Sequence, residues 1–455
     1  YQVNHIGGFF SAFNNEAIKG MNFFKAGFPA RYGGRLSSVV DVHTKEGNMK
    51  EFHGSASLGL VSGNLNLEGP IWKDRTSFNI ALRRTWLDVL TAPVLAIVNK
   101  KNKKNGEKVK VIMGSDTRRS GYMLRSALTA GLNSMGVDID FVGVISTPAV
   151  AYITKAKEAD AGIMISASHN PAKDNGLKVF GGNGYKLPDE VEEEIENLMD
   201  SVEEITKNPI AGDKVGRFKY AEDEYYLYRD HLLNSVKGDF AGMKIIVDAA
   251  NGSAYRIARE VFLALGAEVV VINDAPNGTN INVKCGSTHP EILAKVVVGY
   301  EADLGLAYDG DADRLMAVDR NGNIVDGDKI IATLALLMKK KGELKGNKVV
   351  TTVMSNMGLE NYLKDNEIQL LRASVGDRYV LEKMIAEEVG IGGEQSGHII
   401  LLDYATTGDG VLTSLKLVEA LRDEKKHLDE MVKDIKDWPQ KLVNVVVDNL
   451  SLIHI

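Results

Sequence analysis

The sequence has a single cysteine, Cys285, among its 455 residues. An internal disulfide is therefore excluded, and a reducing compartment is the natural environment for such a chain. The sequence also lacks any run of about 18 apolar residues, so it predicts no transmembrane helix. Neither sign of charge is in large excess. The formal net charge is −7 and the basic residues are mixed among the acids, which argues against a general nucleic-acid surface.

The composition is that of an ordinary globular protein, with 44% hydrophobic and 25% charged residues. A chain of 455 residues is too long for one core and suggests about three or four domains. The sequence begins at Tyr1, with neither an initiator methionine nor a signal peptide before it. We therefore expect an N-terminus that has been cut.

The first part of the chain, up to about residue 95, alternates apolar residues with small or polar ones. The apolar positions are Leu58, Leu60, Leu65, Leu67, Phe78, Ile80 and Leu82. A period of two, broken at Gly69-Pro70 and at Lys73-Asp74, predicts strands joined by turns. The resulting antiparallel sheet would have one apolar face, and the pattern alone fits a soluble sandwich as well as a membrane barrel.

A basic polar run over 99–106 separates this part from a different pattern. A nucleic-acid patch would fit the run, but a solvated linker fits it better, so we place the junction of the two parts here. Beyond the junction, short apolar runs alternate with amphipathic stretches. Strands are expected over 109–113, 141–145, 161–165, 243–247 and 348–353, and helices over 122–135 and after Pro188. Three successive units of about 100 residues predict three similar layered α/β domains.

A serine, Ser168, follows the apolar run that ends at Ile165. A serine at the end of a strand is most often a turn former. Here Pro171 stiffens the loop, and Lys178 supplies a cation where a phosphoryl group on the serine would need one. The loop therefore points to Ser168 as a functional hydroxyl.

Three carboxylates, Asp309, Asp311 and Asp313, alternate on a glycine-containing loop after another apolar run. They can turn toward one hard cation, and oxygen ligands suit Mg²⁺. A solvated acidic turn is one alternative, whereas an EF-hand loop would need a glutamate at the position of Met316. Because three crowded carboxylates would repel one another without a cation, we favour a metal site, with Arg314 placed to meet phosphate oxygens.

Two further loops carry polar side chains. The glycine-rich segment 392–398 contains Glu394, Ser396 and His398, whose donors and acceptors suit sugar hydroxyls. The segment 114–121 joins a strand to the N-terminus of a helix, where an anion can bind. A capping role for its Asp or Thr explains this second segment equally well.

Together the four loops closely resemble those of the α-D-phosphohexomutase superfamily, over about 335 residues. The most specific motifs are Ser-His-Asn-Pro at 168–171 and Asp-Gly-Asp-x-Asp-Arg at 309–314. Within the superfamily the chain is most similar to the phosphoglucosamine mutase branch. The features that carry this similarity are the segments 114–121, 278–282, 285–291 and 375–380, and Gln395.

The resemblance implies an intramolecular phosphotransferase that interconverts glucosamine 6-phosphate and glucosamine 1-phosphate through a phosphoserine and a bound 1,6-bisphosphate. It implies a catalytic set of Ser168, Lys178, Arg314 and His398. It implies substrate contacts from Glu394, Ser396 and Arg378. It implies Mg²⁺ as cofactor, held by Ser168, Asp309, Asp311 and Asp313.

The same resemblance bears on partners and location. It implies a hexosamine phosphate substrate, a hexose 1,6-bisphosphate activator and a cytoplasmic mutase part that contacts neither nucleic acid nor membrane. A phosphomannomutase or phosphoglucomutase is the main alternative. A sugar-phosphate binder without catalysis is another, and the oligomeric state stays open.

The N-terminal part resembles a different family. The segment 28–42 looks like the end of the plug domain of TonB-dependent outer-membrane receptors, and the alternating strands after it are similar to the opening of their barrel. The match covers about 90 residues of a much larger kind of protein. It implies a fragment of an outer-membrane protein in front of the mutase part.

Two departures from the mutase pattern bear on activity. The Thr-Asp-Gly-x-Arg-Gly signature of the family's first domain is not found, and the segment 438–445 resembles only the entry to a fourth domain, without its Arg-x-Ser-Gly-Thr phosphate clamp. Charge-assisted hydrogen bonds contribute roughly 1.5–3 kcal/mol each, so losing two or three would weaken substrate binding severely. We expect a chimera of two unrelated reading frames with impaired mutase activity.

The expected fold class is α/β, with three phosphohexomutase-type domains, the first incomplete and a fourth missing, preceded by a β-rich plug- or barrel-like fragment. The expected boundaries are 1–100 for the receptor-like fragment, 108–235, 236–335 and 336–437 for the three domains, and 438–455 for the start of a fourth domain and an unmatched tail.

Overall fold

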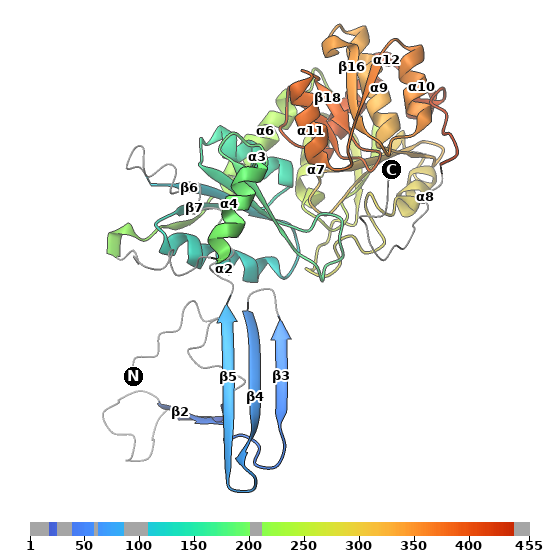
Figure 1. Cartoon of the computed structure of the whole chain (residues 1–455). Coiled ribbons are helices and arrows are strands. Elements are labelled where there is room, and N and C mark those ends of the chain that lie inside the picture. The colour runs from blue at the N-terminus through green and yellow to red at the C-terminus, as the bar shows by residue number, and fades with distance from the viewer. Residues whose placement is uncertain (1–17, 25–38, 59–61, 86–107, 201–211, 441–455) are drawn as a thin grey trace, which may run out of the picture. The chain divides into compact units, whose positions relative to one another are not determined.

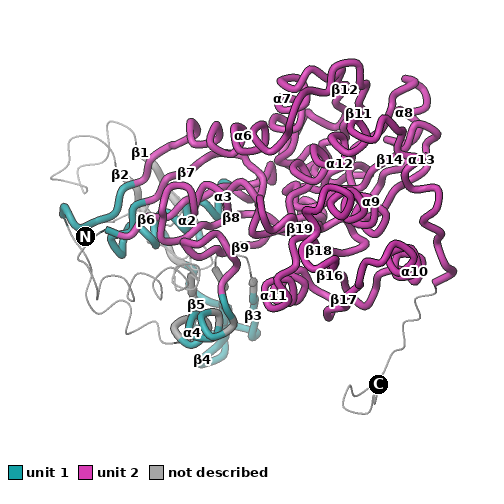
Figure 2. Tube along the Cα trace, turned by 90° about the horizontal axis from the view of Figure 1, so that it is seen from above, with its two compact units in different colours: residues 1–108, 122–138, 188–217 teal, residues 109–121, 139–187, 218–455 magenta. Residues whose placement is uncertain are grey.

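The structure, a computed structural model, describes residues 18–24, 39–58, 62–85, 108–200 and 212–440 (Figure 1). The chain divides into two compact units, which Figure 2 shows in different colours. Unit 1 contains residues 1–108, 122–138 and 188–217, and unit 2 contains residues 109–121, 139–187 and 218–455. The four loops singled out in the sequence all belong to unit 2.

Unit 1 contains two small antiparallel sheets. β1 (Ile18–Phe24) pairs with β2 (Val39–Thr44). β3 (His53–Leu58), β4 (Ser62–Trp72) and β5 (Thr76–Thr85) form a three-stranded sheet in the order β3-β4-β5. The predicted strands and the predicted turn at Lys73-Asp74 are confirmed, and Asp74 has the positive φ of 59° that a tight reversal often requires.

One sequence prediction in this sheet is wrong. Gly69-Pro70 does not break the strand, because both residues lie within β4 and pair with β5. The pairing of β4 with β3 ends at Glu68, so Pro70 has a strand neighbour on one side only. The register also shifts between Pro70 and Trp72. An irregular position with one free side accommodates the missing N–H of a proline.

Three predictions from the sequence concern segments that lie largely outside the described residues: the receptor-like segment 28–42, the basic run 99–106 and the tail after 440. Unit 1 also contains most of α2 (Gly121–Ser134), together with α4 (Asp189–Asp200) and η3 (Gly212–Lys214). Both predicted helices, over 122–135 and after Pro188, are therefore confirmed. Among the described residues, none of the helices has the length and apolar character needed to cross a bilayer.

Unit 2 is built on three sheets. The first has the order β10-β7-β6-β8-β9 and consists of β6 (Lys110–Ser115), β7 (Asp138–Val144), β8 (Ala161–Ile165), β9 (Leu177–Gly181) and β10 (Phe218–Tyr220). The second has the order β12-β11-β13-β14-β15 and consists of β11 (Lys244–Asp248), β12 (Glu268–Ile272), β13 (Leu304–Tyr308), β14 (Leu315–Asp319) and β15 (Ile324–Val325).

The third sheet has the order β17-β16-β18-β19 and consists of β16 (Lys348–Thr352), β17 (Gln369–Ala373), β18 (Ile391–Gly393) and β19 (Ile399–Leu401). The predicted strands coincide with β6, β7, β8, β11 and β16, although β7 begins earlier than expected, at Asp138. Three α/β units in succession are thus confirmed for the part of the chain after residue 108.

The three sheets share one plan. Each contains four strands in the spatial order second, first, third, fourth, counted along the chain: β7-β6-β8-β9, β12-β11-β13-β14 and β17-β16-β18-β19. In each, the third strand is parallel to the first and the fourth returns antiparallel to the third. The turn from third to fourth strand therefore lies at the carboxyl end of a central strand in every sheet, where α/β folds commonly form their sites.

The helices pack between and beside these sheets. Those of the first two sheets are α3 (Thr147–Ala156), η4 (Glu222–Glu224), α6 (Tyr225–Asn234), α7 (Ala254–Ala264) and α8 (Glu291–Gly299). Those of the third are α9 (Gly327–Lys340), η5 (Lys345–Asn347), α10 (Met357–Asp365), α11 (Asp377–Ala386), α12 (Gly410–Glu424) and α13 (Leu428–Val432).

The helix α12 organises the core of unit 2. It is buried along most of its length, and it contacts β13 and β14 of the second sheet, β19 of the third, and the helices α6, α7 and α9. Asp409 caps its N-terminus by accepting from the N–H of Leu412 at 2.9 Å. One largely buried helix thus holds the second and third sheets in a fixed relation, which positions their loops.

Candidate active site

The three turns from third to fourth strand carry the motifs predicted from the sequence. The first, after β8, contains Ser168. The second, after β13, contains the three aspartates. The third, after β18, contains Glu394, Ser396 and His398. The shared plan of the sheets therefore places the three motifs at equivalent positions of three repeated units.

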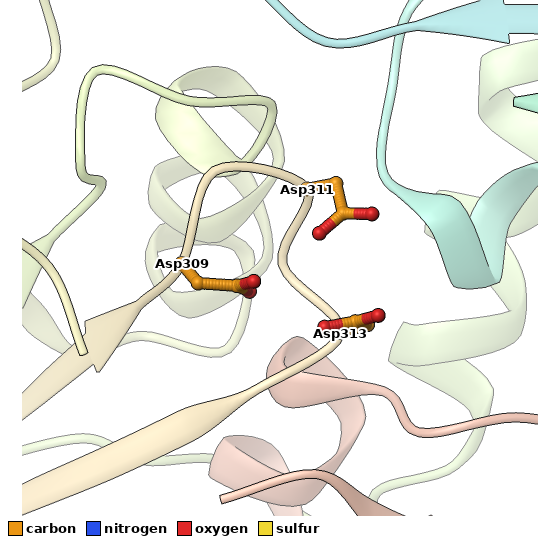
Figure 3. A group of neighbouring side chains, drawn as sticks. All are labelled: Asp309, Asp311 and Asp313. Carbon is orange, nitrogen blue, oxygen red and sulfur yellow. The ribbon is translucent and has the colours of Figure 1, made fainter. Parts of the chain in front are cut away.

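The aspartates of the second turn form a compact buried cluster. Asp309, Asp311 and Asp313 each offer a carboxylate oxygen, and these atoms lie within 4.8 Å of one another. Figure 3 shows the three side chains on the same short loop. None is more than 5% exposed. Three ionised carboxylates at this spacing and burial are stable only beside positive charge.

Part of that charge comes from Lys178 on β9. Its Nζ lies 2.6 Å from Oδ2 of Asp311 and 2.8 Å from Oδ2 of Asp313. Burial acts to lower the pKa of Lys178, but the two aspartates outweigh it and raise this pKa well above its usual value. The structure therefore places Lys178 on the acidic cluster as a permanent cation.

The pKa values of Asp309 and Asp313 shift in opposite directions. Burial, together with the charges of Asp313 and Asp311, raises the pKa of Asp309 well above its usual range. Burial acts to raise the pKa of Asp313 as well, but Lys178 and His398 hold it well below its usual range. A carboxyl group with a raised pKa is one whose charge still lacks a full counter-ion.

The residues present fit a metal ion. Oδ1 of Asp311 and Oδ1 of Asp313 are buried without a hydrogen-bond partner among the described residues. The hydroxyl of Ser168 donates to Oδ2 of Asp309 at 2.6 Å, so its oxygen lies beside the cluster. Three carboxylates and a hydroxyl are the oxygen ligands that a hard divalent cation takes. The acidic cluster therefore suits a metal ion.

The backbone at Ser168 is strained. Its φ is 50°, in the left-handed region that few residues other than glycine adopt. Its N–H donates to Oγ of Ser166 at 2.9 Å, which fixes the direction of the loop. Gly310 permits the close approach of the two turns, because a Cβ there would lie 2.6 Å from the carbonyl oxygen of Ser168. The strain holds the hydroxyl toward the aspartate cluster.

A buried arginine, Arg118, holds this loop in place. Its guanidinium donates to the carbonyl oxygens of Ser168 and Asn170, both at 2.8 Å, to that of Asp174 at 3.0 Å, and to that of Pro171. Four backbone acceptors from one loop converge on a single side chain. The forked guanidinium is the only side-chain group with enough fixed donors for this arrangement.

The counter-ion of Arg118 is Asp116, and neither side chain has any exposed surface. Oδ2 of Asp116 accepts from Nε of Arg118 at 2.7 Å and from Oγ of Ser166 at 2.7 Å. Burial raises the pKa of Asp116, and Arg118 acts against this rise. The sequence left the segment 114–121 between an anion site and a helix cap. Asp116 and Arg118 instead hold the backbone of the serine loop in place, a role that sequence spacing does not reveal.

His398 lies at the end of the third turn and is only 3% exposed. Its Nδ1 is 3.7 Å from Oδ2 of Asp313, and its Nε2 is 3.6 Å from Oδ2 of Asp377. The N–H of Gly408 donates to Nε2 at 3.1 Å, so a neutral ring carries its proton on Nδ1, toward Asp313. His398 thus connects the loop of the three aspartates, residues 309–313 (called the metal loop below), to the third sheet.

The predicted sugar-binding groups lie beside this histidine in the chain. Glu394 accepts from the hydroxyl of Ser396 at 3.1 Å and from the N–H of Gly376 at 3.2 Å. The Gly376 contact connects the third turn to the loop before α11. Glu394 and Ser396 therefore contact each other within the third turn.

Two arginines differ in their placement. Arg314 is close to the metal loop, where its N–H donates to Oδ1 of Asp309 at 3.2 Å, and its buried Nε has no partner among the described residues. Arg378 instead pairs with Glu382 on its own helix at 2.9 Å. The neighbour of Arg378, Asp377, is the residue that reaches His398. Asp377 lies in the segment 375–380 that supports the family resemblance, but the sequence assigned it no role.

His169 was also assigned no role from the sequence. It follows the serine directly, and burial, reinforced by the nearby charge of Arg314, lowers the pKa of its imidazole. Asn282 is a further missed residue, since its Nδ2 donates to the carbonyl oxygens of Ser168 at 2.8 Å and Asn170 at 3.1 Å. Both were hidden because their partners become clear only when the loops are folded together.

The role of Arg118 can be tested by Arg118→Met. We expect this change to lower the free energy of unfolding by about 3–5 kcal/mol, because it leaves Asp116 as an unpaired buried charge and removes the donor to four carbonyl groups. Chemical denaturation of the full chain, followed by circular dichroism, measures the change.

The matched control is Arg259→Met, on the exposed surface of α7. A surface change of this kind costs no more than about 0.5 kcal/mol. Equal losses in the two variants would contradict the role given to Arg118.

Comparisons with known proteins agree with this geometry. Three family models match the chain in order: domain I of the phosphoglucomutase/phosphomannomutase family over residues 87–206, domain II over 226–322 and domain III over 326–437. Each is described as an alpha/beta/alpha domain. The sequence resemblance to phosphohexomutases is thereby confirmed.

Relatives named phosphoglucosamine mutase share much of this sequence. The protein of Fusobacterium nucleatum is 73% identical over 352 residues, which are 77% of this chain and 78% of that protein. The protein of Carboxydothermus hydrogenoformans is 51% identical over 347 residues, 76% of this chain and 78% of that protein.

A crystal structure of a phosphoglucomutase/phosphomannomutase family protein from Burkholderia thailandensis has the same fold. It superposes with a TM-score of 0.66 at 24% identity, and the match covers 82% of this chain and 78% of that one. With this fold, these relatives and the buried aspartate cluster, the chain belongs to the phosphoglucosamine mutases, which are isomerases of the phosphohexomutase superfamily.

Proposed function

We propose that this chain interconverts glucosamine 6-phosphate and glucosamine 1-phosphate by way of a phosphorylated Ser168. The observation that carries the proposal is the position of the Ser168 hydroxyl. It is held in a strained backbone conformation, 2.6 Å from a buried carboxylate of the acidic cluster. A phosphoryl group at this oxygen would be surrounded by the positioned charges that phosphoryl transfer requires.

Transfer begins with a phosphoryl group on Oγ of Ser168. The C1 hydroxyl of glucosamine 6-phosphate attacks the phosphorus, the bond from phosphorus to Oγ breaks, and a 1,6-bisphosphate is formed. After the bisphosphate has reoriented, Oγ attacks the phosphorus of its 6-phosphoryl group and the bond from that phosphorus to O6 breaks. The serine hydroxyl proton passes to O6, and glucosamine 1-phosphate is released. A hexose 1,6-bisphosphate serves as activator because it can transfer a phosphoryl group to an unphosphorylated Ser168 in the same way.

The chain's own residues neutralise and position the reacting groups. Lys178 and Arg314 balance the charge on the phosphoryl oxygens. The raised pKa of Lys178 keeps it protonated, which suits this role better than that of a base. His398, whose neutral form carries its proton on Nδ1, is the remaining proton-transfer candidate.

We assign Mg²⁺ as the metal, with Asp309, Asp311, Asp313 and the Ser168 oxygen as the groups that would hold it. When bound, Mg²⁺ supplies additional positive charge for the phosphoryl oxygens. Glu394 and Ser396 would contact sugar hydroxyls, and Arg378 would reach the substrate only by leaving Glu382. The alternative hexose phosphates of phosphomannomutases and phosphoglucomutases have weaker support, because relatives 51–73% identical are named phosphoglucosamine mutase.

The remaining sequence predictions stay proposals. They are the impaired mutase activity, the domain boundaries at 108–235, 236–335 and 336–437, a cytoplasmic location for the mutase part, and the receptor-like character of residues 1–100. The single, buried cysteine, Cys285, supports a reducing compartment. The strand alternation around β3, β4 and β5 supports the receptor resemblance.

The phosphoserine can be tested by intact-mass measurement. After incubation of the full chain with glucose 1,6-bisphosphate and Mg²⁺, we expect a gain of about 80 Da, the mass of one phosphoryl group. Ser168→Ala removes the acceptor oxygen and should abolish the gain.

Ser134→Ala, at the end of α2, is the matched control and should retain the gain. No gain in the parent chain, or an undiminished gain in Ser168→Ala, would overturn the proposal.

The metal assignment has a separate test in thermal unfolding. Because a ligand that binds only the folded state stabilises it, Mg²⁺ should raise the Tm of the full chain. Asp311→Asn removes a charged ligand from the cluster, so the Tm of this variant should respond much less.

Asp423→Asn alters a carboxylate paired with Lys341 on the surface and should leave the response intact. An equal rise in Tm for Asp311→Asn and the parent chain would contradict the metal site.

A further inference from the structure

Asp377, the first residue of α11, lies beside the predicted sugar-binding turn. The residue before it, Gly376, donates its N–H to Glu394 at 3.2 Å, which ties the two loops together. On the other side, Oδ2 of Asp377 is 3.6 Å from Nε2 of His398. Asp377 is therefore next to two of the groups that face a sugar in the proposed reaction.

The carboxylate of Asp377 already holds an ammonium group of the protein. Nζ of Lys186 donates to Oδ2 of Asp377, and the two side chains remain 30% and 28% exposed. Among the described residues, Oδ1 accepts only the N–H of Arg378, at 2.9 Å. Since each carboxylate oxygen can accept two hydrogen bonds, the group has room for a further donor.

Asp377 also keeps its charge. Burial acts to raise its pKa, but His398 and Lys186 outweigh burial and hold the pKa below its usual value. The carboxylate is thus ionised at neutral pH, as recognition of a cation requires.

The other carboxylates of the site have different partners, and none of their ion pairs within the described part of the chain is with a partly exposed lysine next to the proposed sugar-binding turn. Asp309, Asp311 and Asp313 are at most 5% exposed and face the metal loop and Lys178. Glu394 accepts from Ser396 and Gly376. Among these five acidic side chains, Asp377 combines partial exposure with a contact to an alkylammonium.

We infer that Asp377 forms a subsite for the protonated amino group of a 2-amino-2-deoxyhexose phosphate, and that Lys186 occupies this subsite when no substrate is bound. The inference rests on the proposed function and deepens it by naming the residue that selects an amino sugar. The substrate's ammonium donates to Asp377 and competes with Nζ of Lys186. A hexose phosphate presents a neutral hydroxyl there and gains no ion pair.

The subsite predicts opposite effects from its two members. A charge-assisted hydrogen bond to a partly exposed carboxylate corresponds to discrimination of about tenfold. Asp377→Asn keeps an acceptor for the N–H of Arg378 but loses the charge. Lys186→Met keeps the charge and removes the competing ammonium.

The measurement is calorimetric titration of the full chain with glucosamine 6-phosphate and with glucose 6-phosphate at neutral pH. The quantity of interest is the Kd of glucose 6-phosphate divided by the Kd of glucosamine 6-phosphate, a ratio that rises with the preference for the amino sugar. We expect Asp377→Asn to lower the preference for the amino sugar about tenfold, and Lys186→Met to raise it. Glucose 6-phosphate affinity should change little in Asp377→Asn, which a merely structural loss would not spare.

Asp403 and Lys345 provide a matched control, because they form another Asp–Lys pair on the same part of the chain, about half exposed and away from the sugar-binding turn. Asp403→Asn and Lys345→Met should leave the ratio unchanged. An unchanged ratio in Asp377→Asn, or a lowered ratio in Lys186→Met, overturns the inference alone. Failure of the parent chain to bind either sugar phosphate overturns the proposed function and the inference with it.

Discussion

The structure of the site depends on the burial of three carboxylates on one short loop. Asp309, Asp311 and Asp313 can share this space only if cations from elsewhere in the chain come close to them. Lys178 supplies such a cation from the first sheet, and the ring of His398 approaches Asp313 from the third, while the aspartates belong to the second. The buried negative charge of one loop therefore requires all three repeated units to meet. A metal ion would balance the part of this charge that the protein's own side chains do not neutralise.

The repeated topology makes this meeting geometrically simple. Each sheet turns from its third to its fourth strand at the same place, so three copies of one plan supply three equivalent loops. One loop contains the Ser168 hydroxyl, one contains the three aspartates, and one contains the groups that we propose to bind the sugar. The buried helix α12 fixes the second and third units, whereas Arg118 and Asn282 secure the serine loop through its backbone. Stability and positioning are thus provided by different residues from those that face the substrate.

Much of this could be predicted from the sequence where the signal is local. The strand over 161–165, the loop after it and the aspartate loop were identified because short apolar runs and motif spacing act over a few residues. Gly69-Pro70 was misread as a break because the effect of a proline depends on which side of a strand has a neighbour. That property belongs to the sheet and not to the local sequence.

The site residues that were missed have partners far away in the chain. Arg118 acts on carbonyl groups about 50 positions later, and Asp377 meets Lys186 across nearly 200 positions. Residue type alone gives no hint of such contacts, and the pairing of Arg378 with Glu382 likewise becomes visible only in the fold. Charged residues in a motif identify the region of a candidate active site, and only the fold shows which of them lie at the site itself.

The most direct test of the account is a time course of phosphorus NMR spectra. The full chain is mixed with glucosamine 6-phosphate, Mg²⁺ and a trace of glucose 1,6-bisphosphate. The account predicts that a signal of phosphate on C1 grows as the signal of phosphate on C6 declines, and that Ser168→Ala shows neither change. Absence of the C1 signal with the parent chain, or its appearance at the same rate with Ser168→Ala, would contradict a mutase that acts through Ser168.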